Sequence, residues 1–158
     1  MARSAEPCEV TTSIVVERSI QQCWDLYINN ALVSDWAPSI TKVECDATQL
    51  DLGITRKNHL IVNGKEGHTT ELCTLFDPLK KIEFDIIEET FGLSHMLTSY
   101  GFSLSFNVQN DHTLLILQTR YVPKKVFSSI MRSKKMQQQL LDFTSDLLEN
   151  YKTYAQKQ

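Results

Sequence analysis

The sequence lacks the long apolar segments that are typical of membrane-spanning and exported proteins. No apolar run approaches the roughly 20 residues that a transmembrane helix needs. The first ten residues, MARSAEPCEV, contain no apolar core of the kind that a signal peptide carries, so we expect a cytoplasmic protein. Repeats, low-complexity tracts and linkers are also absent. At 158 residues we expect one domain over 1–158, with its core at about residues 10–154.

Motifs for metal binding and nucleophilic catalysis are missing as well. The four cysteines are Cys8, Cys23, Cys45 and Cys73. They form no CxxC pair, and we interpret them as small buried side chains in a reducing cytosol. The four histidines are His59, His68, His95 and His112. Because none is spaced as HxH, HxxxH or HExxH, we expect no metal and no other cofactor. There is no GxSxG elbow, and the sequence leaves any catalytic residue unknown.

Charge is unevenly distributed along the chain. The net charge is −3, yet residues 120–158 hold eight basic and three acidic residues. The basic excess is concentrated in Lys124, Lys125, Arg132, Lys134 and Lys135. Such a block can steer an anionic ligand or a membrane surface, and an ordinary solvated helix face is the alternative. No basic stripe is interleaved with aromatics, which disfavours nucleic-acid binding.

The first third of the chain predicts a strand followed by two short helices. Residues 10–17 are β-branched and apolar, as in a strand. Ser19 suits the N-cap of the next helix, whose apolar stripe includes Trp24 and should face a sheet. Asn29-Asn30 breaks that helix, and a second short helix over 31–36 stops before Pro38.

Residues 40–122 follow the two-residue period of strands. Strands are predicted at 40–45, 53–62, 65–76, 82–88, 100–108 and 113–121. Asn63-Gly64 favours positive φ at two successive residues and is the strongest hairpin signal. In 100–108 we expect Tyr100, Phe102, Leu104, Phe106 and Val108 to face inward, with Ser103, Ser105 and Asn107 outward. The pattern leaves the facing of 53–62, 65–76 and 113–121 open, and 91–96 is a loop or short turn.

A long helix is predicted at the C-terminus. Pro123 suits its first turn, and the helical pattern continues to about Tyr154. Its apolar stripe consists of Leu140, Phe143, Leu147, Tyr151 and Tyr154. Residues 133–139 carry only Met136 as an apolar residue, so a bend or a separate turn is expected near 132–135. This weakly apolar first half cannot seal a sheet tightly.

The order of elements predicts an α+β fold. Strands joined mostly by short turns give an antiparallel sheet. We expect a helix-grip fold, in which a seven-stranded antiparallel curved sheet surrounds the long C-terminal helix and two short helices follow the first strand. The expected buried core includes Trp24, Phe84, Phe102, Leu104, Leu140 and Leu147.

Several short motifs occur in a recognisable order. They are Ile14 and Val16 in a strand, Trp24 in a helix, Leu32, Trp36-Ala37-Pro38, Ile40-Thr41-Lys42-Val43-Glu44, Phe76-Asp77-Pro78 with Ile82 and Phe84, Asp111-His112-Thr113-Leu114 and Tyr121-Val122-Pro123. Together, over about residues 10–154, they resemble the START/Bet v 1-like (SRPBCC) superfamily, in its polyketide cyclase/dehydrase-like branch. The glycine-rich turn of the plant pathogenesis-related branch is missing, because the hairpin here reads Asn63-Gly64-Lys65-Glu66-Gly67. This argues against close kinship with that branch.

The resemblance implies a deep apolar cavity between sheet and C-terminal helix, which different members use for lipids, sterols, polyketides or plant hormones. We therefore expect a small hydrophobic ligand to bind there. The expected lining is Trp36, Phe84, Tyr100, Phe102, Leu104, Met131 and Met136. The expected cavity mouth is Lys124, Arg132, Lys134 and Lys135, which would hold an anionic headgroup.

Two other functions stay open. The first is a polyketide aromatase/cyclase or dehydratase, for which an inward acid–base pair would be the signature. Its candidate residues are Arg56, His59, His68, Glu71, Tyr100, Arg120 and Tyr121. The second is a protein-interaction module resembling the chaperone-activating members of the superfamily, for which a filled cavity would be the signature. Transient contact with a membrane surface is compatible with the basic block.

Overall fold

The computed structural model describes residues 6–158 as a curved sheet that surrounds a long helix. The strands are β1 (Cys8–Val16), β2 (Ile40–Glu44), β3 (Thr55–Val62), β4 (Lys65–Asp77), β5 (Lys81–Glu89), β6 (Leu97–Gln109) and β7 (His112–Pro123). The helices are α1 (Ile20–Ile28), α2 (Val33–Trp36), α3 (Leu93–Met96), α4 (Ser128–Met131) and α5 (Lys134–Ala155), with 3₁₀ turns η1 (Asn30–Leu32) and η2 (Lys125–Phe127). The expected helix-grip architecture is confirmed.

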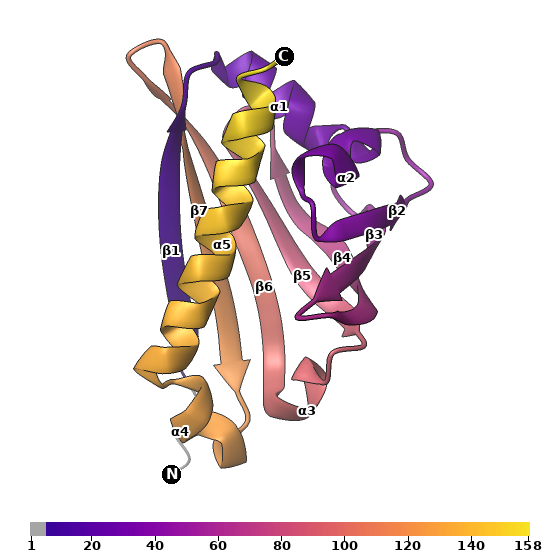
Figure 1. The fold of residues 1–158 in the computed structure, drawn as a ribbon, viewed down its shortest axis with the longest axis vertical. Coiled ribbons are helices and arrows are strands. Elements are labelled where there is room, and N and C mark those ends of the chain that lie inside the picture. Colours follow the sequence, from indigo (N-terminus) through magenta and orange to yellow (C-terminus); the bar gives the residue numbers. More distant parts are fainter. Residues whose placement is uncertain (1–5) are drawn as a thin grey trace.

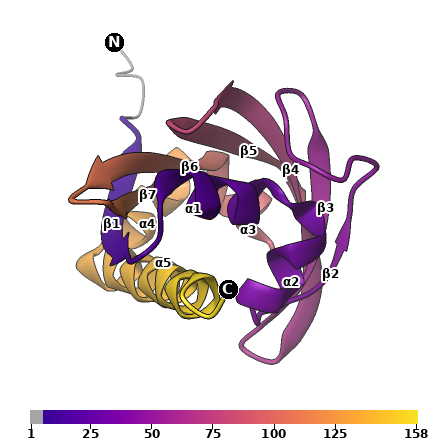
Figure 2. The same cartoon turned by 90° about the horizontal axis from the view of Figure 1, so that it is seen from above.

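All seven strands form one sheet in the order β1-β7-β6-β5-β4-β3-β2, and every neighbouring pair is antiparallel. Figure 1 shows α5 running along the β1 and β7 side, with α1 and α2 across one end. In the view from above, the sheet curves round until β2 and β3 lie on the far side from β1 (Figure 2). The concave face therefore holds α5 on one side and leaves the β3–β5 side less covered by helix.

The Asn63-Gly64 hairpin forms as predicted. Asn63 has φ 52° and Gly64 has φ 77°, and the flanking residues Val62 and Lys65 are paired across β3 and β4. Two successive positive φ values match the right-handed twist of the strands, which explains why Asn-Gly is favoured there.

The C-terminal helix begins later than predicted. Pro123 ends β7, opposite Leu97 of β6, instead of opening a helix. The expected interruption near 132–135 is confirmed, because α5 starts at Lys134 after Ser133, whose hydroxyl accepts a hydrogen bond from the Met136 backbone N–H at 3.2 Å. The N-cap requires extended backbone at Ser133, so α4 and α5 cannot be one continuous helix.

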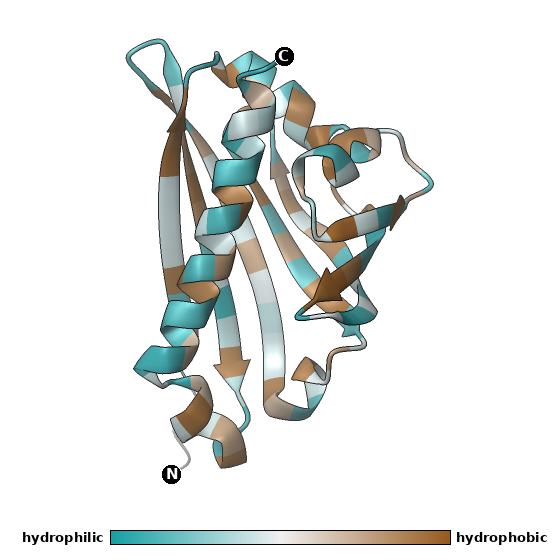
Figure 3. Ribbon diagram, viewed as in Figure 1, coloured by the Kyte–Doolittle hydropathy of each residue, from teal (hydrophilic) through white to brown (hydrophobic). Residues whose placement is uncertain are grey.

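The buried stripe of α5 is rotated from the predicted one. Thr144, Leu148, Tyr151 and Ala155 are buried, whereas Leu140, Leu147 and Tyr154 are half-buried and Phe143 is 46% exposed. The reason is that α5 packs mainly on β1, at one side of the concave face. Figure 3 shows hydrophobic and hydrophilic residues alternating along α5. Phe143 and Leu147 consequently lie on the side of α5 that faces away from β1.

The main core lies between α1, α2, α5 and the sheet. Trp24, Phe84 and Leu104 are buried as expected, while Phe102, like Leu140 and Leu147, is only half-buried. Trp24 anchors α1 to the sheet, because its ring centroid lies 5.2 Å from that of Phe76 and 5.0 Å from that of Phe106.

Two side chains in β6 depart from the expected alternation. Val108 is 69% exposed, because it lies in the hairpin tip beyond the region that α1 and α5 cover. Ser103 is buried despite its outward position, between Glu83 of β5 and Gln118 of β7. Cys8, Cys23 and Cys73 are buried, Cys45 is half-buried, and all four are free thiols. Within residues 6–158, no helix combines the length and the apolar character needed to cross a membrane.

Candidate ligand-binding cavity

A cavity of about 310 Å³ lies between the concave face of the sheet and α5. Its lining comes from β2 to β6, the residue before β2, the segment before α3, α3 itself and α5. The lining residues are Ser39, Ile40, Asn58, Leu60, Val62, Thr69, Glu71, Ile86, Phe91, Leu93, Tyr100, Phe102, Phe143 and Leu147. Most are apolar, and the polar ones other than Ser39 lie on β3, β4 and β6. An apolar cavity with a few polar groups is the usual form of a small-molecule site.

Strand alternation explains which side chains reach the cavity. Asn58, Leu60 and Val62 lie two residues apart on β3, so they share its concave face. On β4, Thr69 and Glu71 are also two residues apart and share the concave face. The structure thereby resolves the facing that the sequence left open: Arg56 and Glu71 point inward, and His59 and His68 point outward. On β7, Tyr121 is buried and Arg120 is exposed.

A buried ion pair underlies the polar part of the lining. Arg56 Nε donates to Glu71 Oε1 at 2.5 Å, and Arg56 Nη2 contacts the same oxygen. Arg56 Nη1 donates to Asn30 Oδ1 at 3.2 Å, and the guanidinium lies 5.2 Å from the centroid of the Phe84 ring. Burial opposes the charged form, but the Glu71 carboxylate outweighs it, so the pKa of Arg56 is raised. The opposite charges of Arg56 and Glu71 therefore neutralise each other inside the protein.

Asn58 and Tyr100 stand beside this pair. Asn58 is 4% exposed, and its Oδ1 has no hydrogen-bond partner among residues 6–158. Burial raises the pKa of Tyr100 to about 12, and the Glu71 and Glu89 carboxylates act in the same direction. The Tyr100 hydroxyl therefore stays protonated at neutral pH. Buried polar groups are normally paired, so the unpartnered Asn58 oxygen is an exception among the described residues.

The rim beside α3 is fixed by Glu89. This carboxylate accepts hydrogen bonds from the backbone N–H of Phe91 at 2.7 Å and of Ser94 at 2.8 Å. Burial alone would raise the pKa of Glu89, but these hydrogen bonds prevail and lower it. Gly67 lets the rim pack on β4, because a Cβ there would lie 2.7 Å from the Phe91 ring. Phe91 is thereby held over the cavity edge.

The sequence analysis predicted seven lining residues. They lie in three different parts of the structure: the cavity, a small void and a second core. Tyr100 and Phe102 line the cavity, and Phe84 is buried under Arg56. Trp36 and Leu104 instead border a separate void of about 20 Å³ near Tyr151. The Trp36 Nε1 group is buried and has no hydrogen-bond partner within residues 6–158.

Met131 and Met136 lie in a second, smaller core. Met131 is buried beside Tyr121, whose hydroxyl donates to the Met131 carbonyl at 2.6 Å, and Met136 packs against the same cluster. The sequence analysis placed both methionines at the cavity because the weakly apolar first half of the C-terminal helix was not expected to seal the sheet. Asn58, Leu60 and Phe91 were missed. The alternation of Asn58, Leu60 and Val62 was the available signal.

The basic residues are not part of the cavity lining. Arg132 donates to the Glu6 carbonyl oxygen at 2.6 Å and to Ser128 Oγ at 3.0 Å, so it ties the start of β1 to α4. Lys124, Lys134 and Lys135 are exposed near α4, at the end of the molecule where β1 begins (Figure 1). Their role as a headgroup site stays a prediction.

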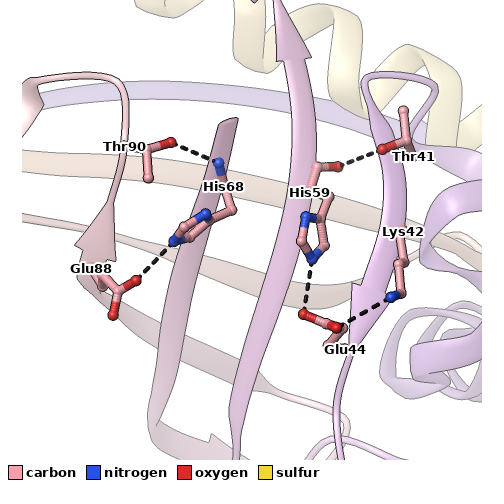
Figure 4. A network of polar contacts seen from close by, with 7 residues as sticks. All are labelled: Thr41, Lys42, Glu44, His59, His68, Glu88 and Thr90. Atoms are coloured by element: carbon pink, nitrogen blue, oxygen red, sulfur yellow. Dashed lines mark hydrogen bonds and ion pairs between the residues drawn. The ribbon is translucent and has the colours of Figure 1, made fainter. Parts of the chain in front are cut away.

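The outward histidines form a separate polar network (Figure 4). His59 and His68 are paired across β3 and β4, with ring centroids 6.1 Å apart. His59 Nε2 lies 2.9 Å from Glu44 Oε2, and His68 Nε2 lies 2.8 Å from Glu88 Oε1. No group of three or more metal-ligating side chains occurs in the described part of the chain. Each histidine is therefore matched to one carboxylate on the convex face.

Comparisons with known proteins give a likeness in structure alone. No protein-family model matches the sequence, and no curated protein matches it. Among solved structures, Ara h 8.0201 is 11% identical, with 97% of this chain and 100% of the other covered, at a TM-score of 0.77. Major latex-like protein 151 from Panax ginseng is 12% identical, with 94% and 97% covered, at a TM-score of 0.76.

The fold is that of the Bet v 1-like proteins. A further example of this Bet v 1-like fold is norcoclaurine synthase from Thalictrum flavum, in complex with dopamine and hydroxybenzaldehyde. It is 16% identical, with 98% of this chain and 89% of the other covered, at a TM-score of 0.75. The expected superfamily fold is thus confirmed. At such identities the likeness speaks to the fold, and the resemblance to one branch stays a prediction.

Proposed function

We propose that this protein binds a small hydrophobic molecule in the cavity between the sheet and α5. The observation that carries the proposal is the lining itself: aliphatic and aromatic side chains from six elements converge on about 310 Å³, with Asn58, Glu71 and Tyr100 at one part of the wall. Burying apolar ligand surface there would contribute about 25 cal/mol per Å² removed from water. The polar groups would fix the ligand's orientation.

Binding is favoured over the alternatives by two observations. The enzyme alternative called for an inward acid–base pair, but the Glu71 carboxylate is engaged by Arg56, and the pKa of Tyr100 is about 12. Efficient general acid–base groups have pKa values near the working pH. The interaction-module alternative called for a filled cavity, whereas about 310 Å³ between the sheet and α5 is unfilled here. The dopamine and hydroxybenzaldehyde complex of norcoclaurine synthase supports small aromatic molecules as ligands of this fold.

The test is to fill the cavity with a larger side chain and measure the loss of ligand binding. N-phenyl-1-naphthylamine, a neutral dye whose fluorescence rises in apolar surroundings, is titrated into the wild type and into Leu60→Trp. Leu60 lines the cavity, so the indole should occupy ligand space and weaken dye binding by about tenfold or more.

Ile61→Trp is the matched control. Ile61 is the next residue on β3, points to the convex face and is 44% exposed, so an indole there leaves the cavity open. Dye binding should be unchanged in this variant. Equal loss in both variants, or no binding to the wild type, would contradict the proposal.

A further inference from the structure

The segment between β7 and α5 exposes two aliphatic side chains. Val126 in η2 is 85% exposed, and Ile130 in α4 is 61% exposed. The inward side of the same segment is taken by Phe127 and Met131, which pack into the second core. Single exposed apolar residues are common on protein surfaces, but two in one lysine-rich segment give that segment an amphipathic character.

Lysines flank this aliphatic pair on both sides in the sequence. They are Lys124, Lys125, Lys134 and Lys135. All four are exposed, and none forms an ion pair with another of residues 6–158. The sequence has no acidic residue from His112 to Leu141. We call Val126, Ile130 and these four lysines the α4 surface.

The backbone that carries the α4 surface is held in place by hydrogen bonds. The Lys124 N–H donates to the Met96 carbonyl at 2.8 Å, and the Tyr121 hydroxyl donates to the Met131 carbonyl at 2.6 Å. Figure 3 shows brown, hydrophobic stretches around α4 beside the teal first turn of α5. The apolar and the charged parts of the surface therefore lie next to each other at one end of the molecule.

We propose that the α4 surface docks on an anionic lipid bilayer, with Val126 and Ile130 inserted among the headgroups and the four lysines beside the lipid anions. Lysine stems lie along apolar surface while their ammonium groups stay hydrated, which suits the boundary between headgroups and acyl chains. Each lysine close to an anionic leaflet strengthens binding by about fivefold. This docking does not depend on a ligand in the cavity.

A bilayer fits this surface better than an acidic protein does. A stable protein interface buries about 800 Å² on each partner around a well-packed apolar core. Two aliphatic side chains on one-turn helices provide little of such a core. A fluid bilayer needs no matching shape, because its headgroups rearrange around the inserted side chains and the lysines.

The experiment is sedimentation of the protein with vesicles. One set is phosphatidylcholine with about a quarter phosphatidylserine, and the other is phosphatidylcholine alone. We expect binding to the anionic set only, and binding should weaken as salt shortens the Debye length below about 8–10 Å. Lys134→Gln combined with Lys135→Gln should weaken binding by about 10- to 25-fold.

The matched charge control is Lys80→Gln combined with Lys157→Gln. Both lysines are exposed. Lys157 lies next to the C-terminus, at the opposite end of the molecule from α4 (Figure 1), and Lys80 lies in the turn before β5. This variant loses the same net charge, so its binding should stay within about twofold of the wild type if the effect is local.

The aliphatic pair is tested by Val126→Ser combined with Ile130→Ser. Binding to the anionic vesicles should fall by about tenfold or more, because two apolar side chains no longer leave water. The control is Leu52→Ser combined with Val108→Ser, which changes side chains that are 62% and 69% exposed elsewhere in the fold, and its binding should be unchanged. Because all four positions are exposed, both variants should fold, which urea unfolding verifies.

Three results would overturn the proposal. The first is equal binding to both vesicle sets without salt dependence. The second is binding to soluble polyglutamate but not to anionic vesicles, which would indicate an acidic protein partner instead. The third is loss of vesicle binding in Leu60→Trp, since that would assign the effect to lipid in the cavity. The dye titration of the cavity is a separate measurement, so either proposal can fail without the other.

Discussion

Replacing Glu71 by glutamine removes one charge from the buried pair while keeping the side chain's shape and one acceptor oxygen. Arg56 and Glu71 are each 3% exposed, so the remaining guanidinium cannot regain water. Breaking a buried pair by removing one partner costs about 3–5 kcal/mol. Arg56 would keep its hydrogen bond to Asn30 and its contact with the Phe84 ring. We therefore expect Glu71→Gln to lower the free energy of unfolding by about 3 kcal/mol, the lower end of that range.

Urea unfolding measures this loss. With an m value of about 1–3 kcal/mol per molar urea, the midpoint should fall by roughly 1–3 M. The matched control is Glu83→Gln, which removes a carboxylate paired with Lys81 at 3.0 Å where both side chains are partly exposed. Surface pairs contribute about 0–1 kcal/mol, so this control should barely move the midpoint.

The companion variant removes both charges. Arg56→Met combined with Glu71→Leu leaves no uncompensated ion, and such replacements are often neutral or stabilising. The double variant should be clearly more stable than Glu71→Gln. A loss below about 1 kcal/mol for Glu71→Gln would refute the reasoning, because it would mean that water in the cavity solvates Arg56.

Two further predictions concern α5 and the convex face. Leu148→Ala should cost about 2–5 kcal/mol, whereas Leu147→Ala should cost less because Leu147 is half-buried beside the cavity; equal losses in urea unfolding would contradict the packing described. Hydrogen bonds from His59 and Lys42 lower the pKa of Glu44 from 4.5 to about 2. Because the folded pKa is lowered, this stabilisation is present above about pH 4.5 and is lost as the pH falls toward about 2. NMR titration should show the Glu44 midpoint returning toward 4.5 in His59→Phe, and an unchanged midpoint would argue against the contact.

The fold could be predicted because its signals are local and repeated. The Asn63-Gly64 turn, the alternation in β5 and β6 and the helical period after Leu140 each determine one element, and short connections make the sheet antiparallel. The rotation of α5 could not be predicted from its own sequence. Leu147 and Leu148 are equally apolar, and only packing on β1 decides which of them is buried.

The lining of the candidate cavity was predicted only in part, because its polar residues contradict the usual pattern. Tyr100 and Phe102 were found from clean alternation in β6. On β3 and β4 the inward positions include Arg56, Asn58 and Glu71, which a hydrophobic pattern would place outward. They are buried because Arg56 and Glu71 neutralise each other across neighbouring strands, where they are direct partners in the register. Such pairing depends on the sheet register, which the sequence alone does not give.

The most direct test of the central claim is to locate a bound ligand by NMR. Unlabelled 2-naphthol is added to isotope-labelled protein, and intermolecular nuclear Overhauser effects from the naphthol ring are collected. The account predicts contacts from the ring to the methyl groups of Leu60, Ile86 and Leu147. Contacts only to exposed convex-face methyl groups such as Ile61, or to Met131 and Met136 near the basic residues, would contradict it.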